Sequence, residues 1–229
     1  MKVFLDVGAH AGWTLMAIRD PKYRFDDIYC FEPTSACWPA LERLADRRVT
    51  ICRFGLWNRT TAQTLYDAGS RSASLYADKF EDARSEEEVE LVRAADWFRE
   101  HLRDDDEVYL KLNCEGAEAD IVEDLLESGE FARLRAVMID PDVRKIPSQR
   151  HRERELRERL RATGFTNYAM EEDVMIGDTH RLRIQNWLRA VGAEEHSPWL
   201  AARQAGYIVR EALEGRREPL RTALSGRDS

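Results

Sequence analysis

The sequence predicts an α/β fold with a mostly parallel central sheet. Short apolar runs alternate with helical patterns through the N-terminal half, which is typical of βαβ units. The first run, Val3–Val7, is almost entirely apolar, as expected of a strand that is buried on both faces. A chain of 229 residues is also long enough to bury the core of one large α/β domain. These three observations favour a layered sandwich of helices and sheet.

A glycine turn follows the first predicted strand. Gly8 and Gly12 bracket this turn, and a helical pattern covers Trp13–Arg19. A strand, turn and helix in this order bring backbone N–H groups and the positive end of the helix together, which favours the polar end of a cofactor. A second apolar run, Ile28–Phe31, ends in Glu32. A carboxylate at that distance is placed to accept hydrogen bonds from ribose hydroxyls.

Three kinds of cofactor site compete for this turn. A dinucleotide site has the pattern G-x-G-x-x-G, whereas the chain has G-x-x-x-G preceded by Asp6. A phosphate-binding loop ends in Gly-Lys-Ser/Thr, which the turn lacks. The pattern Asp-x-Gly-x-x-x-Gly with the distant Glu32 fits best the S-adenosylmethionine (SAM) site of class I methyltransferases. The alternative is a turn with a structural role only.

The third predicted strand, Val49–Phe54, places Gly55–Trp57 at its C-terminal tip, where ligands sit in open α/β sheets. Trp57 is placed either to stack on an adenine or to serve as a core or lid residue. Residues 59–85 contain one short predicted strand, Thr64–Tyr66. Their length and position favour a substrate-facing loop.

The rest of the chain continues the alternation as one domain, with a core at 1–177 and a helical C-terminal extension at 178–229. We expect the extension to cap the substrate pocket or to build a homodimer contact. The other predicted elements are a helix from Thr34 or Ser35 to about Ala45, an edge strand at Val89–Val92, a helix at Ala95–Leu102, strands at Val108–Asn113 and Leu134–Ile139, a charged helix at 148–163, and a strand at Phe165–Ala169 with a hairpin partner at Val174–Ile176.

Three motifs resemble those of the FkbM-type methyltransferases, in the same order, over about residues 3–142. They are Phe4-Leu5-Asp6-Val7-Gly8-Ala9-His10-x-Gly12, Phe31-Glu32-Pro33 and Leu110-Lys111-Leu112-Asn113-Cys114-Glu115-Gly116-Ala117-Glu118. The resemblance implies a class I, Rossmann-like three-layer sandwich, SAM as the methyl donor, and O-methylation of sugars or hydroxylated natural products. His10 stands where the family usually has Asn, and Asn113 stands where it usually has Asp.

The motifs and strand tips together indicate the candidate site residues. Cofactor contacts are predicted for Asp6, Gly8, Ala9, His10, Gly12, Glu32, Pro33, Gly55, Leu56, Trp57 and Asn113. Asp6, Gly8 and Gly12 would shape the methionine side of the pocket, Glu32 would bind the ribose, and residues 55–57 would border the adenine. The candidate catalytic residues are Glu115, Asp142 and Lys111.

A hydroxyl acceptor is a weak acid, so its methylation benefits from a base or a metal ion. Glu115 follows one predicted strand, and Asp140 and Asp142 follow the next. If these strands are neighbours, the three carboxylates suit Mg²⁺, with Asn113 nearby. This arrangement is similar to that of metal-dependent O-methyltransferases of the catechol and macrocin kinds. The alternative is that Glu115 alone acts as the base and the aspartates cap turns.

The composition of the chain limits the classes of partner that we expect it to bind. The net charge of −8 argues against a nucleic-acid partner, because phosphate binding needs a basic surface. No run approaches ~20 apolar residues and no signal-peptide pattern opens the chain, so we expect a cytoplasmic protein that does not enter a membrane. The four cysteines form no C-x-x-C pair, which favours reduced core cysteines.

The acidic chain and the polar loop suit a neutral sugar or short oligosaccharide as the acceptor. A polyketide or another hydroxylated natural product is the alternative acceptor. Two other classes stay open, namely a nucleotide-binding module of a dehydrogenase-like or regulatory kind, and a methyltransferase fold that only binds SAM.

Overall fold

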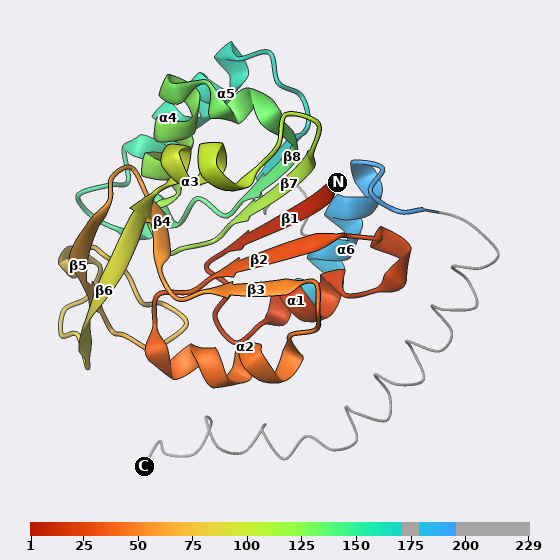
Figure 1. Ribbon diagram of the computed structural model, residues 1–229. Helices are drawn as coiled ribbons and strands as arrows, with labels where there is room; N and C mark the ends of the chain where they lie inside the picture. Colours follow the sequence, from red (N-terminus) through yellow and green to blue (C-terminus); the bar gives the residue numbers. More distant parts are fainter. Residues whose placement is uncertain (171–178, 196–229) are drawn as a thin grey trace.

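The computed structural model describes residues 1–170 and 179–195 and contains a main sheet of six parallel strands. The strands are β1 (Lys2–Val7), β2 (Asp27–Phe31), β3 (Val49–Cys52), β7 (Glu107–Leu112), β8 (Leu134–Ile139) and β9 (Tyr168–Met170). Their order is β3-β2-β1-β7-β8-β9 (Figure 1). The strand order therefore reverses direction between β1 and β7, and ligands bind at such a switch point in open α/β sheets. The predicted α/β class with a parallel central sheet is confirmed.

Helices cover both faces of the main sheet. The helices are α1 (Trp13–Ile18), α2 (Trp38–Leu44), α3 (Ala94–His101), α4 (Glu118–Ser128), α5 (Arg152–Ala162) and α6 (His180–Ala190). Helices α3, α4 and α5 lie on one face, and α1, α2 and α6 lie on the other (Figure 1). Short 3₁₀ turns occur at Pro21–Tyr23, Ser35–Cys37, Ala77–Lys79, Glu130–Arg133 and Asp142–Lys145.

Side chains of β1 alternate between two apolar cores. Val3, Leu5 and Val7 pack into the cluster beneath α3, α4 and α5, whereas Phe4 packs into the cluster with α1 and α6. Successive side chains of a strand point to opposite faces, so a doubly covered strand requires a nearly continuous apolar run, in which Asp6 is the one buried polar residue between Val3 and Val7. The burial of β1 thus follows directly from its sequence.

A second sheet of three strands stands beside the carboxyl ends of the main sheet (Figure 1). It consists of β4 (Gly55–Trp57), β5 (Thr61–Tyr66) and β6 (Glu86–Arg93) in the order β4-β6-β5. The prediction of an edge strand at Val89–Val92 is wrong, because β6 pairs with β4 on one side and with β5 on the other. The predicted strand tip at residues 55–57 is itself a strand of this sheet.

Other boundaries differ modestly from the expectations. β3 ends at Cys52, two residues before the predicted end, and α5 covers Arg152–Ala162 within the predicted 148–163. The last strand is Tyr168–Met170 and pairs in parallel with β8. Its predicted hairpin partner at Val174–Ile176 lies outside the described residues.

The described part of the C-terminal extension belongs to the core. Ile184, Trp187 and Leu188 of α6 are fully buried in the cluster that also contains α1. An ion pair of 2.8 Å between Lys22 Nζ and Glu194 Oε1 ties the segment after α6 to the turn after α1. None of the helices in residues 1–170 and 179–195 is long and apolar enough to cross a membrane.

Candidate functional site

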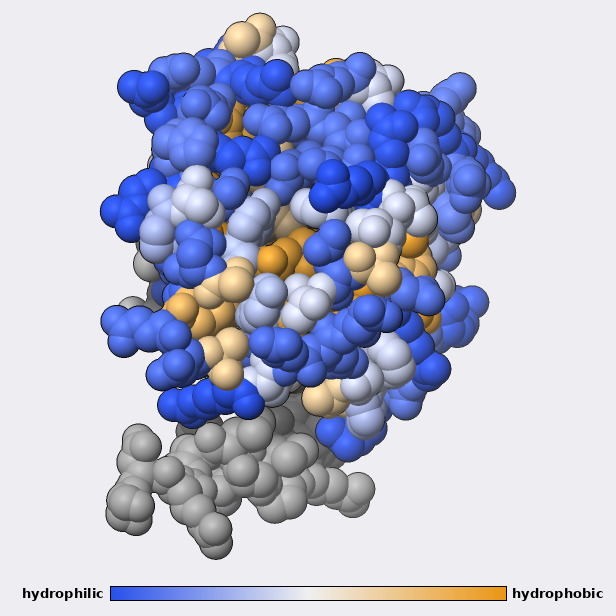
Figure 2. Space-filling model, turned by 90° about the vertical axis from the view of Figure 1, so that its left-hand side faces the viewer, coloured by the Kyte–Doolittle hydropathy of each residue, from blue (hydrophilic) through white to orange (hydrophobic). Residues whose placement is uncertain are grey.

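A cavity opens at the carboxyl ends of β1, β2 and β7, where the main sheet meets the second sheet. It encloses about 680 Å³ of space, counted with the solvent at its mouth. This side of the molecule shows a small apolar area in a hollow that hydrophilic side chains surround (Figure 2). A mostly apolar hollow with few polar groups is typical of ligand sites.

The glycine turn forms the floor of the cavity. The N–H groups of Gly8 and Ala9 both donate to the carbonyl of Phe31 at 3.1 Å, which ties the turn to the end of β2. Gly8 has φ 77°, and a Cβ there would collide with the carbonyl oxygen of Asn113. Only glycine allows this close approach of the loops after β1 and β7.

Glu32 lies at the end of β2 and lines the cavity although it is only 6 % exposed. Its Oε2 accepts the N–H of His10 at 2.8 Å, and its Oε1 accepts the N–H of Thr34 at 2.9 Å. Burial raises the pKa of Glu32, and these two N–H groups counteract part of that rise. Each carboxylate oxygen can accept more than one hydrogen bond, so the group retains acceptor capacity for ligand hydroxyls.

A buried ion pair supports the floor from below. Lys111 Nζ lies 3.0 Å from Asp6 Oδ1 and donates to the carbonyls of Val7 at 3.2 Å and Gly8 at 2.9 Å. Asp6 and Lys111 are almost inaccessible to solvent. Both side chains therefore hold the glycine turn in place without lining the cavity.

The second sheet supplies an apolar wall. Leu56 of β4, Leu65 of β5 and Leu91 of β6 line the cavity, next to Phe31. Trp57 does not line it, because its indole Nε1 donates to Asp120 Oδ2 at 3.1 Å. The structure thus places this tryptophan in a packing role, away from a stacking position in the cavity.

Asp120 of α4 is the centre of a buried polar network. Besides Trp57, it accepts from Tyr76 Oη at 2.6 Å, from Asn58 Nδ2 at 3.1 Å and from Arg152 Nη1 at 2.9 Å. The network connects β4, the loop before β6, α4 and α5. The sequence showed no signal for it beyond an acid in the first turn of a helix.

The loop between β5 and β6 forms the far wall through Ser70, Arg71, Ala73 and Leu75. Its segment at 66–74 closes on itself through a pair of backbone hydrogen bonds between Tyr66 and Ser74. The sequence pointed to this loop as substrate-facing but indicated none of these residues individually.

Glu115 lines the cavity from the loop after β7, with a left-handed φ of 58°. Its Oε2 lies 2.5 Å from Lys79 Nζ, and its carbonyl accepts the hydroxyl of Ser74 at 2.6 Å. Burial and the nearby charge of Asp142 raise the pKa of Glu115, while Lys79 lowers it. The carboxylate is therefore both held in place and more basic than an exposed one.

Asp140 and Asp142 follow β8, which is the direct neighbour of β7, as the magnesium hypothesis required. Asp142 is fully buried, and its Oδ1 lies 2.5 Å from Lys145 Nζ. Asp140 Oδ2 accepts Asn113 Nδ2 at 3.2 Å. Within residues 1–170 and 179–195, no group of three or more His, Cys, Asp or Glu side chains is placed to hold a metal ion, so the magnesium hypothesis has no support.

Glu118, in the first turn of α4, stabilises the loop that carries Glu115. It is fully buried and accepts the N–H groups of Cys114 at 2.8 Å and Gly116 at 3.0 Å. Burial and the charge of Asp142 raise the pKa of Glu118 to about 7.

The cavity brings together about half of the predicted site residues. Those that line it are Gly8, His10, Glu32, Pro33, Gly55, Leu56, Asn113 and Glu115. Those that do not line it are Asp6, Ala9, Gly12, Trp57, Lys111, Asp140 and Asp142. Ala9 is buried in the core, and Gly12 packs closely against Leu44 of α2, so both serve the shape of the turn.

Comparison with known proteins identifies the family of the chain. Residues 6–166 match the family model described as the methyltransferase FkbM domain. No curated protein and no solved structure shows a significant match to the chain.

Proposed function

Because the chain belongs to the FkbM methyltransferase domain family, we propose that this methyltransferase uses SAM to methylate a hydroxyl of a sugar or oligosaccharide. The observation that carries the proposal is the position of Glu32. Its carboxylate lines the cavity at the switch point of the sheet and is fixed by the N–H groups of His10 and Thr34. Hydroxyl groups of a ribose are natural donors to such a carboxylate.

The cavity fits SAM in three respects. Gly8 lines the cavity, and its lack of a Cβ lets the loop after β7 pack against the turn, so backbone of both loops borders the ligand space. Glu32 would hold the ribose, and Leu56, Leu65 and Leu91 offer an apolar surface to the adenine. When bound, SAM supplies an electrophilic methyl group on a sulfonium sulfur, which becomes a thioether as the methyl group leaves.

Glu115 is the residue that we assign as the base. The acceptor oxygen would gain the methyl group, and its proton would pass to Glu115 Oε1, while Lys79 holds Oε2. Burial and Asp142 raise the pKa of Glu115, which makes its carboxylate a better proton acceptor. Because the base acts in its deprotonated form, we expect the rate to rise with pH through this raised pKa.

Lysine side chains form ion pairs with two of the carboxylates that the magnesium hypothesis assigned to a metal ion. Lys79 pairs with Glu115, and Lys145 pairs with Asp142, each at 2.5 Å. We therefore propose that these ammonium groups, and not a metal ion, balance the charge of the two carboxylates.

A hydroxylated natural product is the alternative acceptor, since the apolar wall of the second sheet also suits a polyketide. The family match favours methyl transfer over the dehydrogenase-like alternative. Calorimetry with SAM and NAD, followed by transfer of a radiolabelled methyl group to a panel of sugars and polyketides, tests the proposal. We expect SAM to bind and NAD not to bind. Binding of NAD without SAM would overturn the proposal, and binding of SAM without transfer to any acceptor would indicate a protein that only binds SAM.

A further inference from the structure

A cation on the cavity wall has no counter-charge within the described residues. Arg71 lines the cavity and is exposed, and no other described residue holds its guanidinium by a hydrogen bond or ion pair. Neither carboxylate of the wall pairs with Arg71. Glu32 accepts two backbone N–H groups, and Glu115 pairs with Lys79. The charge of Arg71 is therefore available to a ligand.

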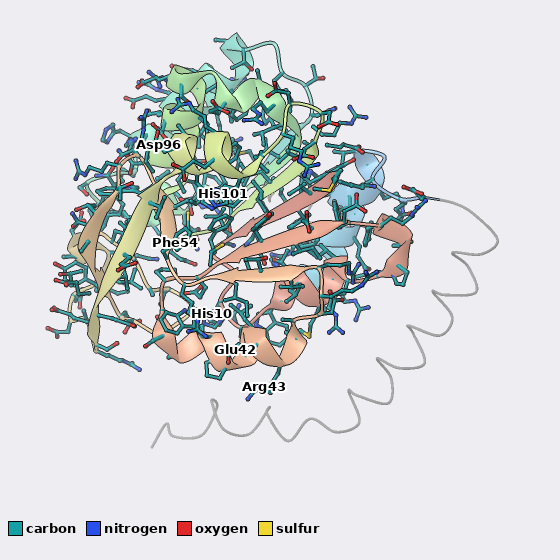
Figure 3. All side chains as sticks on the ribbon, in the orientation of Figure 1. His10, Glu42, Arg43, Phe54, Asp96 and His101 are labelled. Carbon is teal, nitrogen blue, oxygen red and sulfur yellow. The ribbon has the colours of Figure 1, made fainter. Side chains whose placement is uncertain are left out.

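His10 lines the same cavity next to the glycine turn. Its Nε2 is buried, and no described residue forms a hydrogen bond with it. Burial lowers the pKa of His10, and the charge of Arg71 lowers it further, while a hydrogen bond with the Gly69 backbone raises it. With its pKa lowered, His10 adds no second positive charge to this wall. Figure 3 shows His10 at the carboxyl end of the main sheet, on the side of α2.

The loop holds Arg71 at a defined position. The N–H of Ser70 donates to the carbonyl of Asp67 at 3.1 Å, and the N–H of Ser72 donates to Ser70 Oγ at 3.1 Å. Lys79 Nζ donates to the carbonyl of Ser72 at 2.8 Å. A binding group on such a constrained backbone loses less entropy when its ligand arrives.

We propose that Arg71 forms an anion subsite that binds a carboxylate or phosphate group of a ligand in the cavity. A guanidinium presents its N–H groups as a planar fork that matches both anions. The anion has two candidate sources, namely the carboxylate of the methionine part of SAM and an acidic group on the acceptor. The inference rests on the proposed function. If the acceptor is the source, the inference adds a charged group to an acceptor otherwise expected to be neutral.

The first arm of the test examines the cofactor. Calorimetry measures the affinity of S-adenosylhomocysteine, which carries the carboxylate, and of 5′-methylthioadenosine, which lacks it. The variants are Arg71→Gln and Arg71→Lys, with Arg84→Gln as the matched control, because Arg84 is exposed on the same connection and does not line the cavity. If SAM supplies the anion, Arg71→Gln weakens S-adenosylhomocysteine at least ~10-fold and leaves methylthioadenosine unchanged.

The second arm examines the acceptor. With S-adenosylhomocysteine bound, calorimetry compares 4-nitrophenyl β-D-glucuronide with the corresponding glucoside, which carries a hydroxymethyl group in place of the carboxylate. If the acceptor supplies the anion, the wild type binds the glucuronide at least ~10-fold more tightly than the glucoside, and Arg71→Gln removes this preference. Arg71→Lys should retain part of the effect in either arm, because it keeps the charge and loses the fork.

The outcomes separate the two proposals. Equal affinities of wild type and Arg71→Gln for S-adenosylhomocysteine, together with no preference for the glucuronide, would overturn the subsite and leave the proposed function standing. Failure of the wild type to bind S-adenosylhomocysteine would overturn the proposed function and the subsite with it. If Arg71→Gln and Arg84→Gln lose the same amount of affinity, the loss comes from the general surface charge, and the subsite is also overturned. Thermal unfolding of each variant checks the fold.

Discussion

At the scale of single residues, two buried glutamates have different tasks. Glu32 lines the cavity and keeps acceptor capacity for a ligand, whereas Glu118 is enclosed by α4 and the loop after β7. The first therefore affects chiefly ligand binding, and the second affects chiefly stability. Each leads to a separate prediction.

Replacing Glu32 with Gln tests the ribose contact. The amide would turn its NH₂ group toward one of the two backbone N–H donors and could no longer accept from both ribose hydroxyls. We expect SAM affinity to fall by ~1.5–3 kcal/mol, or roughly 10- to 150-fold, and the free energy of unfolding to fall by ~1–3 kcal/mol. Calorimetry and urea unfolding measure the two effects. Glu42→Gln on the exposed side of α2 is the control, and an unchanged SAM affinity for Glu32→Gln would show that the ribose is bound elsewhere (Figure 3).

The pKa of Glu118 makes stability depend on pH. A glutamate in the unfolded chain has an ordinary pKa of 4.5, and burial and Asp142 raise the pKa of Glu118 to about 7 in the folded chain. Between these values the folded state binds a proton that the unfolded state has released, so this contribution is full below pH ~4.5 and is lost as the pH rises to ~7. Glu118→Gln cannot titrate.

We therefore expect the unfolding free energy of wild type minus that of Glu118→Gln to fall by on the order of 3 kcal/mol from pH 4.5 to pH 7. Urea unfolding at several pH values across this range measures it, with the exposed Glu100→Gln as the control. A difference that stays constant, or that grows with pH, would contradict the raised pKa.

At the scale of secondary-structure elements, the C-terminal helix α6 belongs to the main core. Trp187 is fully buried, and its ring lies 6.1 Å from that of Phe4 in β1 in an edge-on arrangement. Removal of such a side chain leaves a cavity in addition to the lost apolar burial.

We predict that Trp187→Ala lowers the free energy of unfolding by ~3–5 kcal/mol. Leu182→Ala on the same helix, where Leu182 is 44 % exposed, should change it by no more than ~0.5 kcal/mol. Urea unfolding measures both variants. Similar small losses in the two would mean that α6 packs only loosely on α1 and β1.

Lysines pair with the carboxylates that follow the neighbouring strands β7 and β8, and these pairs bear on whether methyl transfer needs a metal ion. With Lys79 on Glu115 and Lys145 on Asp142, we expect methyl transfer to survive exhaustive chelation with less than a twofold change in rate. Add-back of Mg²⁺ should then have no effect. Loss of activity in chelator that Mg²⁺ restores would instead return Glu115 and Asp142 to the role of metal ligands.

At the scale of the whole molecule, charge decides which partners can approach. The chain carries 43 acidic and 35 basic residues, for a net charge of −8. Binding the phosphate backbone of a nucleic acid requires a basic surface, so we expect no mobility shift with DNA or RNA at ~0.15 M salt. A saturable shift would show that the basic residues gather on one face strongly enough to overcome the net charge.

The sequence alone determined the first half of the candidate site. An apolar run predicts β1 because a doubly covered strand needs apolar residues on both faces. Gly8 predicts the turn because glycine tolerates a left-handed backbone, which it adopts in the structure. Glu32 follows from its place after the next apolar run. These features depend on neighbours in the sequence or on one parallel strand pair, so local patterns suffice to find them.

Only the tertiary structure decided the other half of the candidate site, namely the wall from the second sheet and the partners of its side chains. The pairing of β4 with β6 and the position of β6 between two strands result from contacts across the 59–85 loop, which no local pattern encodes. The same holds for side-chain partners. Lys79 reaches Glu115 although 36 residues separate them, and Trp57 reaches Asp120 across 63 residues. A side chain's pKa and availability depend on which groups surround it in space, so the folded chain alone reveals that Glu115 is paired and that Arg71 is free among the described residues.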